Sequence, residues 1–282
     1  MSAATGVVII VGTPIGNLGD LSPRAREALA GADVICCEDT RHTRKLLSHA
    51  GISGVPLLAL HEHNEVDLAP GVVGRAAAGE IVAVVTDAGL PGISDPGERL
   101  VAAAVAAGVT VTVVPGPSAP LVALVGSGLP TGRFAFEGFL PRRGAPRRER
   151  LAAVAADPRT TVLFEAPGRV ARTLEDLASV CGAQRRVALA RELTKRFEER
   201  WSGTLAGASA WVEEHEPRGE WALVLDGAPA HAVETSDDDL RAALAAHLAA
   251  GGDRRAAVAA VAAGAGVPKR RVYQLALELR DP

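Results

Sequence analysis

Short apolar runs alternate with longer amphipathic segments along the first 130 residues of the chain. The apolar runs are rich in valine and isoleucine, and an unbroken run of this kind is typical of a parallel strand that is buried on both faces. This pattern predicts five strands, at residues 7–11, 33–37, 57–60, 81–85 and 109–114. Each predicted strand precedes a segment with helical periodicity, so the pattern predicts an α/β fold with a mostly parallel sheet and helices on both faces.

The unusual sequences lie directly after the predicted strands. Glycine-rich or polar segments occupy residues 12–21, 38–44, 60–65, 87–97 and 115–119. The carboxyl ends of parallel strands meet at one edge of a sheet, and α/β proteins bind their ligands beyond that edge. The sequence therefore predicts a small-molecule site at this edge, and the convergence of five segments is stronger support than any single motif.

Residues 86–97, which read TDAGLPGISDPG, form the most distinctive of these segments. Glycine adopts positive φ angles and lets a ligand approach the backbone closely, so a long turn rich in glycine and proline usually shapes a binding site. A purely structural loop is the alternative. Residues 12–20, which read GTPIGNLGD, match neither the dinucleotide-binding pattern GxGxxG nor the phosphate-binding pattern GxxxxGK[ST].

Residues 131–228 show a second alternation of strands and helices. The strand candidates are residues 134–139, 160–164, 186–190, 197–204 and 221–225, and helices fit residues 147–156, 170–181 and 206–215. We interpret this region as a second α/β domain with a mixed sheet, which follows a first domain at residues 1–130. Residues 227–236 lack periodicity and indicate a linker, and residues 237–282 predict a small helical appendage.

The composition indicates an ordinary globular protein, with 48% hydrophobic residues, 22% charged residues and a net charge of −3. A nucleic-acid contact would therefore need a local basic patch. The densest basic cluster comprises Arg142, Arg143, Arg147, Arg148 and Arg150. Arginine pairs with phosphates through two hydrogen bonds, so this cluster favours contact with nucleic acid, and a solvated surface is the alternative.

The cysteines and the apolar stretches bear on cellular location. Cys36 and Cys37 adjoin each other in an apolar run, and the chain has no CxxC spacing, so reduced core cysteines are expected. Such cysteines and a start without basic residues are typical of a cytoplasmic protein. Residues 100–132 carry no charge, but glycine and proline punctuate them, so they predict helix, strand and helix and no membrane span.

Ionisable side chains follow two of the predicted strands. Glu38, Asp39 and Arg41 follow one strand, and His61 and His63 follow the next. These residue types suit proton transfer or hydrogen bonding to hydroxyl groups, and capping or salt bridging is the alternative for each. The two histidines lack a third ligand at a metal-binding spacing, so no metal is expected.

Six motifs occur in an order that resembles a known family. They are GTPIGNL at residues 12–18, EDTR at 38–41, HNE at 63–65, TDAGLPGISDPG at 86–97, PGPSA at 115–119 and FEGFLP at 136–141. Over nearly its whole length the chain is similar to the bacterial small-subunit ribosomal RNA cytidine 2′-O-methyltransferases, a family within the tetrapyrrole-methylase-like superfamily. Residues 237–282 resemble the helix-turn-helix-like domain of that family.

This resemblance implies a tetrapyrrole-methylase-like fold of two α/β domains that binds S-adenosylmethionine in the cleft between them. It implies transfer of the methyl group to the ribose 2′-hydroxyl of a cytidine in the decoding region of 16S ribosomal RNA, in the 30S subunit. It also implies a homodimer. Methyl transfer depends mainly on the positioning of donor and acceptor, and unshielded carbonyl groups with an aspartate nearby suit the sulfonium cation of the donor.

The resemblance also assigns site residues by position. Donor contacts fall on Pro14, Ile15, Gly16, Asp87, Ala88, Gly89, Ile93, Ser94, Ser118 and Ala119, with Glu165, Gly219 and Glu220 from the second domain. RNA contacts fall on Arg41, Asn64, Arg142, Arg143, Arg147 and Arg148. The candidates for the base that removes the hydroxyl proton are Glu38, Asp39, Asp87 and His63, and the sequence does not choose among them.

Two other functions stay open at this point. A tetrapyrrole methyltransferase of the same superfamily would share the fold and the donor, but the arginine cluster and the helical appendage favour RNA. A nucleic-acid-binding regulator would act through the C-terminal helices. Removal of residues 237–282 would abolish the function of such a regulator, whereas a methyltransferase would still bind its donor.

Overall fold

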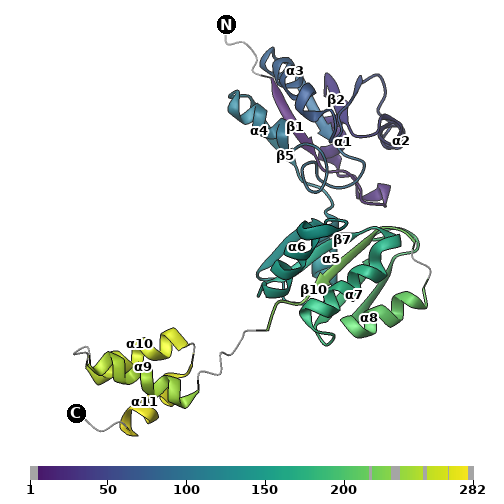
Figure 1. Cartoon of the computed structure of the whole chain (residues 1–282). Coiled ribbons are helices and arrows are strands. Elements are labelled where there is room, and N and C mark those ends of the chain that lie inside the picture. The colour runs from purple at the N-terminus through teal and green to yellow at the C-terminus, as the bar shows by residue number, and fades with distance from the viewer. Residues whose placement is uncertain (1–5, 216–217, 230–235, 250–252, 266, 279–282) are drawn as a thin grey trace. The chain divides into compact units, whose positions relative to one another are not determined.

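A computed structural model describes residues 6–215, 218–229, 236–249, 253–265 and 267–278. The chain divides into two compact units, Met1–Gly227 and Ala228–Pro282, and each is described by itself. Figure 1 shows the two sheets of the first unit and the helices of the second. Among the described residues, no helix is long and apolar enough to span a membrane.

The first sheet is fully parallel. Its strands are β1 (Val7–Val11), β2 (Val34–Cys37), β3 (Leu57–Ala59), β4 (Ile81–Val85) and β5 (Thr110–Val114). They lie in the order β3-β2-β4-β1-β5. The parallel pairing confirms the α/β prediction, and the apolar residues of β1, β2 and β4 contribute to the cores on both faces of the sheet.

Helices cover both faces of the first sheet. One core includes residues of α1 (Pro23–Ala30) and α2 (Thr40–Ala50), and the other includes residues of α3 (Glu65–Ala77) and α4 (Glu98–Ala106). A short 3-10 helix, η1 (Leu18–Asp20), precedes α1. Ser22 caps α1 by accepting a hydrogen bond from the Ala25 N–H at 3.1 Å, and Pro23 begins the helix, as the Ser-Pro pair favours.

The second sheet is mixed, as expected. Its strands are β6 (Phe134–Phe139), β7 (Thr160–Glu165), β8 (Arg186–Arg191), β9 (Glu199–Thr204) and β10 (Trp221–Leu225), in the order β6-β7-β10-β8-β9. β6 and β7 are parallel, and the other pairs are antiparallel. The core on one face includes residues of α6 (Gly144–Ala156), α7 (Val170–Cys181) and α8 (Leu205–Glu213). The 3-10 helix η2 (Pro167–Arg169) precedes α7.

The opposite face of the second sheet is covered by α5 (Ala119–Gly126), which follows the last strand of the first sheet. Ala123 and Leu124 of this helix share a core with Val162 and Val224 of the second sheet. The sequence assigned α5 to a first domain that ends at residue 130, but the helix packs on the second sheet. Its apolar sequence, APLVALVG, fits this buried position and ties the two sheets into one unit.

The second unit is a small helical domain, as the C-terminal sequence predicts. Its helices are α9 (Asp237–Ala249), α10 (Arg254–Ala265) and α11 (Lys269–Glu278). They share a core of their own, which includes Leu240, Leu244, Val261 and Leu275. Most of the expected linker, residues 230–235, lies outside the described residues.

Candidate functional site

Three loops meet at the carboxyl edge of the first sheet. A Cβ atom at Gly116, after β5, would lie 2.7 Å from the backbone carbon of Gly12, after β1, so these two backbones touch. The Thr13 N–H donates to the Gly89 carbonyl at 2.8 Å, and the Gly89 N–H donates back at 3.2 Å. Gly89 has a φ angle of 84°, which favours glycine at this position. The loops after β1, β4 and β5 thus form one connected surface.

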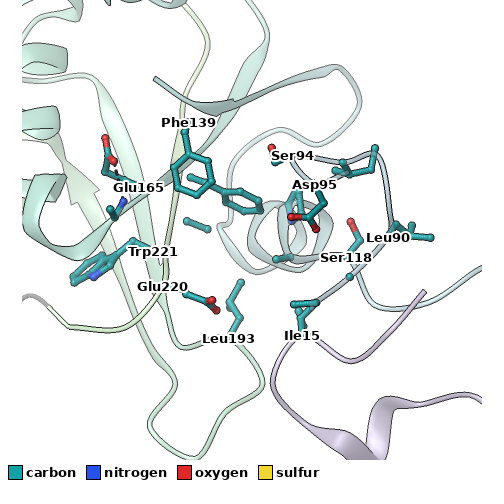
Figure 2. A pocket seen from close by; sticks show the side chains of 18 of the residues that line it. Ile15, Leu90, Ser94, Asp95, Ser118, Phe139, Glu165, Leu193, Glu220 and Trp221 are labelled. Atoms are coloured by element: carbon teal, nitrogen blue, oxygen red, sulfur yellow. Dashed lines mark hydrogen bonds between the residues drawn. The ribbon is translucent and has the colours of Figure 1, made fainter. Parts of the chain in front are cut away.

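A cavity of about 340 Å³ lies between this surface and the second sheet (Figure 2). The loops of the first sheet and the start of α5 contribute Ile15, Ala88, Gly89, Leu90, Ile93, Ser94, Asp95, Ser118, Ala119 and Pro120. The second sheet contributes Phe139, Phe164, Glu165, Ala166, Pro167, Leu193, Glu220, Trp221 and Ala222. A volume of this order and a mostly apolar lining with a few polar groups are typical of small-molecule sites.

Most of the residues that the resemblance assigns to the donor line this cavity. They are Ile15, Ala88, Gly89, Ile93, Ser94, Ser118, Ala119, Glu165 and Glu220. The structure therefore brings together residues that are up to 205 positions apart in the sequence, from Ile15 to Glu220. The loops come from the edge at which the sequence predicts a site, and the strand ends of the second sheet face them.

Four other residues assigned to the donor do not line the cavity, although they lie next to residues that do. Pro14 and Gly16 flank Ile15, and Gly219 precedes Glu220 with its α-carbon against the Glu192 side chain. Asp87 accepts a hydrogen bond from the Asp39 N–H at 3.2 Å, so it connects the loops after β4 and β2. This bond supports the wall that the neighbouring Ala88 and Gly89 form, and the assignment of Asp87 to the donor stays a prediction.

Asp95 is a cavity residue that the sequence analysis did not single out. Burial raises the pKa of its carboxyl group to about 7, and the negative charges of Glu38, Asp87 and Glu220 act in the same direction. The Thr86 hydroxyl, which bonds to the carboxylate, opposes this rise. The only signal in the sequence was the second aspartate of the segment at residues 86–97, because burial and these neighbours arise from the fold.

The predicted base candidates differ in their surroundings. Burial, together with the charge of Asp87, raises the pKa of the half-buried Glu38 carboxyl group. Asp39 caps α2 by accepting the Arg41 N–H at 2.7 Å, and its carboxylate pairs with the Arg41 guanidinium at 2.8 Å. These bonds hold the pKa of Asp39 well below its ordinary range, so it is a poor proton acceptor. His63 is exposed, and neither it nor Glu38 or Asp39 lines the cavity.

The residues assigned to RNA also separate into two groups. Arg142, Arg143 and Arg148 are exposed and have no ion pair within the described part of the chain. Arg41 is also exposed, and its partner is Asp39. Asn64 uses its side chain within its own turn, since it accepts the His61 N–H at 2.8 Å and donates to the Ala59 carbonyl at 3.1 Å.

Arg147 is the clearest correction within the arginine cluster. Its side chain is buried, and its guanidinium donates to Asp176 at 2.8 Å, to Thr173 at 2.9 Å and to the Pro141 carbonyl at 3.0 Å. A guanidinium with these partners holds α6 against α7 and is not available to a phosphate. We therefore remove Arg147 from the RNA-contacting set. Arg150 pairs with Glu137 at 3.1 Å.

Two buried glutamates support the cavity walls. Glu165 accepts hydrogen bonds from the Thr173 hydroxyl at 2.6 Å and the Ala166 N–H at 2.8 Å, and it pairs with Arg169. Glu65, whose role the sequence did not reveal, accepts the Gly97 and Leu100 N–H groups at 3.0 Å each and so caps α4. Among the described residues, no three histidine, cysteine, aspartate or glutamate side chains form a group that could hold a metal ion.

The chain is similar in sequence to a known protein family and to several named proteins. The model of the family "Tetrapyrrole (Corrin/Porphyrin) Methylases" matches residues 7–209. A Synechocystis protein named "Ribosomal RNA small subunit methyltransferase I" is 45% identical over 97% of this chain and 98% of its own length. A protein of the same name from Xylella fastidiosa is 54% identical over 79% of this chain and 82% of its own length.

Solved structures share the fold at lower identity. The methyltransferase CobJ superposes with a TM-score of 0.59 at 24% identity, over 79% of this chain and 94% of its own. Uroporphyrin-III C-methyltransferase from Thermus thermophilus, in complex with S-adenosylhomocysteine, superposes with a TM-score of 0.56 at 19% identity. That match covers 78% of this chain and 97% of the Thermus chain. These likenesses support the tetrapyrrole-methylase-like architecture of the two sheets.

Proposed function

Because the chain belongs to the tetrapyrrole methylase family, we propose that it transfers a methyl group from S-adenosylmethionine to a ribose 2′-hydroxyl of 16S ribosomal RNA. The acceptor would be a cytidine in the decoding region of the 30S subunit. One observation carries this proposal: the wall of a cofactor-sized cavity includes Phe139, and the exposed Arg142 and Arg143, which have no ion pair among the described residues, follow it closely in the sequence. The shared name of relatives that match nearly the whole chain agrees with an RNA substrate.

The cavity residues fit the proposed donor. Phe164 and Leu193 offer an apolar surface to an adenine ring, and Gly89 leaves its backbone open to close approach. The Asp95 and Glu220 carboxyl groups at the lining provide negative charge for a cation. When bound, S-adenosylmethionine supplies a methyl group that its sulfonium has already activated. The protein's own task is to hold the donor and the hydroxyl group in line and to exclude water.

The proposed RNA surface comprises Arg41, Arg142, Arg143 and Arg148. Arg142 and Arg143 follow β6, and the last residue of β6, Phe139, lines the cavity. Exposed positive charge therefore follows a residue of the cavity wall within four positions of the sequence. Phosphate contacts of this kind position a nucleic acid without reading its bases.

We also propose that the protein acts in the cytoplasm as a homodimer. Leu121 and Val125 lie four residues apart on α5, and therefore on one face of the helix, with 47% and 75% of their surfaces exposed. Apolar side chains exposed in this way are suited to contact a second copy of the chain. Sedimentation of the purified protein at several concentrations tests this, and a monomer at all of them would contradict it.

The decisive experiment for the function is methyl transfer from radiolabelled donor to 30S subunits that lack the modification. We expect label in 16S RNA, at a ribose of the decoding region when the RNA is digested and its nucleosides are separated. Fully modified 30S subunits serve as the control and should accept no label. Label in a tetrapyrrole and none in 30S subunits would contradict the RNA substrate and favour the tetrapyrrole methyltransferase.

The arginine surface gives a second test of the RNA substrate. The double variant Arg142→Ala/Arg143→Ala should bind 30S RNA more weakly. The slope of the logarithm of its binding constant against the logarithm of the salt concentration should be shallower by about 0.7–0.9 for each lost phosphate contact. Its affinity for the donor should stay unchanged, because neither arginine lines the cavity. Arg147→Ala is the contrasting variant: we expect it to lower the free energy of unfolding, since it removes the three hydrogen bonds of a buried guanidinium. An unchanged salt dependence in the double variant would contradict this surface.

A further inference from the structure

Three carboxyl groups line the cavity, and they differ in their partners. Glu165 is buried and already bonded to Thr173, Ala166 and Arg169. Glu220 pairs with Lys195 at 2.9 Å, and 78% of its side chain is exposed. Asp95 has no ion pair in the described part of the chain, and its carboxyl group is hydrogen-bonded to the neutral hydroxyl group of Thr86. Of the three, Asp95 is the carboxyl group that is free to exchange a proton with a ligand.

The backbone around Asp95 is held in place on both sides. Ser94 has a φ angle of 62°, which is unusual for a residue with a side chain, and the Gly92 N–H donates to the Pro96 carbonyl at 3.1 Å. Beyond Pro96, Glu65 binds the N–H groups that begin α4. Figure 2 shows Asp95 beside Ser94 and Ser118, on the side of the cavity away from Glu165 and Trp221. A fixed loop therefore presents this carboxyl group to the cavity.

The charges around Asp95 favour its protonated form. Glu38 after β2, Asp87 after β4 and Glu220 before β10 each raise its pKa, and burial contributes the largest part. The hydrogen bond from the Thr86 hydroxyl lowers it. The resulting pKa of about 7 contrasts with Asp39, whose pKa the Arg41 guanidinium holds far lower. A proton acceptor is most effective when its pKa lies near the working pH.

We propose that Asp95 is the catalytic base of the reaction, an inference that rests on the proposed function. As the 2′-oxygen forms its bond to the methyl carbon, the carbon–sulfur bond breaks and its electron pair stays on sulfur. The hydroxyl proton passes to the Asp95 carboxylate. The negative charge of the carboxylate and the positive charge of the sulfonium disappear together, so the products are a neutral acid, an ether and a thioether. Methyl transfer therefore leaves neither of these charges unpaired in the cavity, where an unpaired charge would be costly.

The experiment compares methyl-transfer rates of the full-length protein on unmodified 30S subunits from mildly acidic to mildly alkaline pH. The unaltered protein should show a rate that rises with pH and levels off, because the base must lose its proton before it can act. Asp95→Asn should lower the rate by about 10²–10⁴-fold, which is the range typical of a general base. It should also remove the inflection from the pH profile. Its donor affinity, measured by calorimetry, should change far less. Glu98→Gln, an exposed residue at the start of α4, is the matched control and should keep the full rate.

Two further variants move the inflection in opposite directions. Glu38→Gln removes a negative charge that raises the pKa of Asp95, so the inflection should shift to lower pH. Thr86→Val removes the hydroxyl that lowers that pKa, so the inflection should shift to higher pH. A merely structural role for Asp95 would produce neither shift. These two variants test the proposal even if Asp95→Asn fails to fold.

Three results would overturn the proposal. The first is an Asp95→Asn variant that folds and keeps a rate within about tenfold of the unaltered protein, outside the range of a lost general base. The second is an inflection that does not move in either Glu38→Gln or Thr86→Val. The third is loss of activity in Glu38→Gln with Asp95→Asn active, which would make Glu38 the base. If the unaltered protein fails to methylate 30S subunits, the proposed function itself fails, and this shows before any variant is compared.

Discussion

The two sheets contribute to the cavity in different ways. The first sheet contributes loops, whose lining includes the hydroxyl groups of Ser94 and Ser118 as well as aliphatic side chains, and whose backbones touch one another, as at Gly12 and Gly116. The second sheet contributes strand ends, and most of their lining side chains are apolar, with Phe139, Phe164 and Leu193 among them. The hydroxyl groups of the lining therefore come from the loops, and its aromatic side chains come from the second sheet, which we call the apolar wall.

The difference follows from the topology of each sheet. Parallel strands place all their carboxyl ends at one edge, so each loop of the first sheet that reaches the cavity is a continuous stretch of sequence. In the second sheet, antiparallel pairing sets Trp221 opposite Glu165 and Arg191, so the start of β10 meets the ends of β7 and β8. Substitutions in the loops of the first sheet should therefore be tolerated less well than substitutions in the apolar wall. A clash between two backbones cannot be relieved by a change of side-chain rotamer.

The largest effect is expected at the contact of two loop backbones. Gly116→Ala would place a Cβ 2.7 Å from the Gly12 backbone, closer than real contacts allow, so one loop must move. Overpacking of this kind costs about 1–3 kcal/mol, and we expect a loss of donor affinity of tenfold to about a hundredfold. Isothermal titration with S-adenosylmethionine measures the affinity, and urea unfolding measures the stability.

Gly74→Ala is the matched control for that variant. Gly74 lies inside α3, and a Cβ there would meet no atom within 4 Å. Alanine in a helix interior should raise the free energy of unfolding by about 0.5–1 kcal/mol and leave donor affinity unchanged. If Gly116→Ala bound the donor as well as Gly74→Ala does, the loops of the first sheet would not form the rigid wall inferred from their contact.

A smaller effect is expected on the apolar wall. Phe139 lines the cavity with 53% of its surface exposed, so Phe139→Ala should leave the fold intact. Loss of one aromatic contact should weaken donor binding by about 1 kcal/mol, or several-fold. Phe197→Ala serves as the control, because Phe197 is 68% exposed and does not line the cavity. A loss larger than that of Gly116→Ala would reverse the ranking of the two regions.

The same contrast explains which parts of the site the sequence reveals. Most strands of the first sheet were predictable because they are unbroken apolar runs, and the family resemblance could assign Ile15, Gly89 and Ser118 because each lies in a local motif. The mixed second sheet could also be predicted as a class, but not the pairing that brings β7, β8 and β10 to one cavity edge. Nor did any local pattern show that α5 would pack on the second sheet.

Three side chains show why the remainder needs the structure. Arg147 has exposed arginines as neighbours in sequence, and only the packing of α6 on α7 buries it. Glu65 caps α4, which begins more than thirty residues later, by accepting hydrogen bonds from the Gly97 and Leu100 N–H groups. The pKa of Asp95 depends on carboxyl groups from three separate segments. Burial and long-range partners decide each role, and neither is encoded in local spacing.

The smallest effect is expected from removal of the helical unit. Both regions of the cavity lie within Met1–Gly227, whose cores end at Leu225, and the core of the second unit begins at Leu240. A protein that ends at Gly227 should therefore fold and bind S-adenosylmethionine within about twofold of the full chain, as independent regions do. The affinity of the same fragment for 30S RNA reports whether the helical unit, in which α11 begins with Lys269, Arg270 and Arg271, contributes to RNA binding. A donor affinity reduced more than tenfold, in a fragment that unfolds cooperatively, would show that loops and wall alone do not make the site.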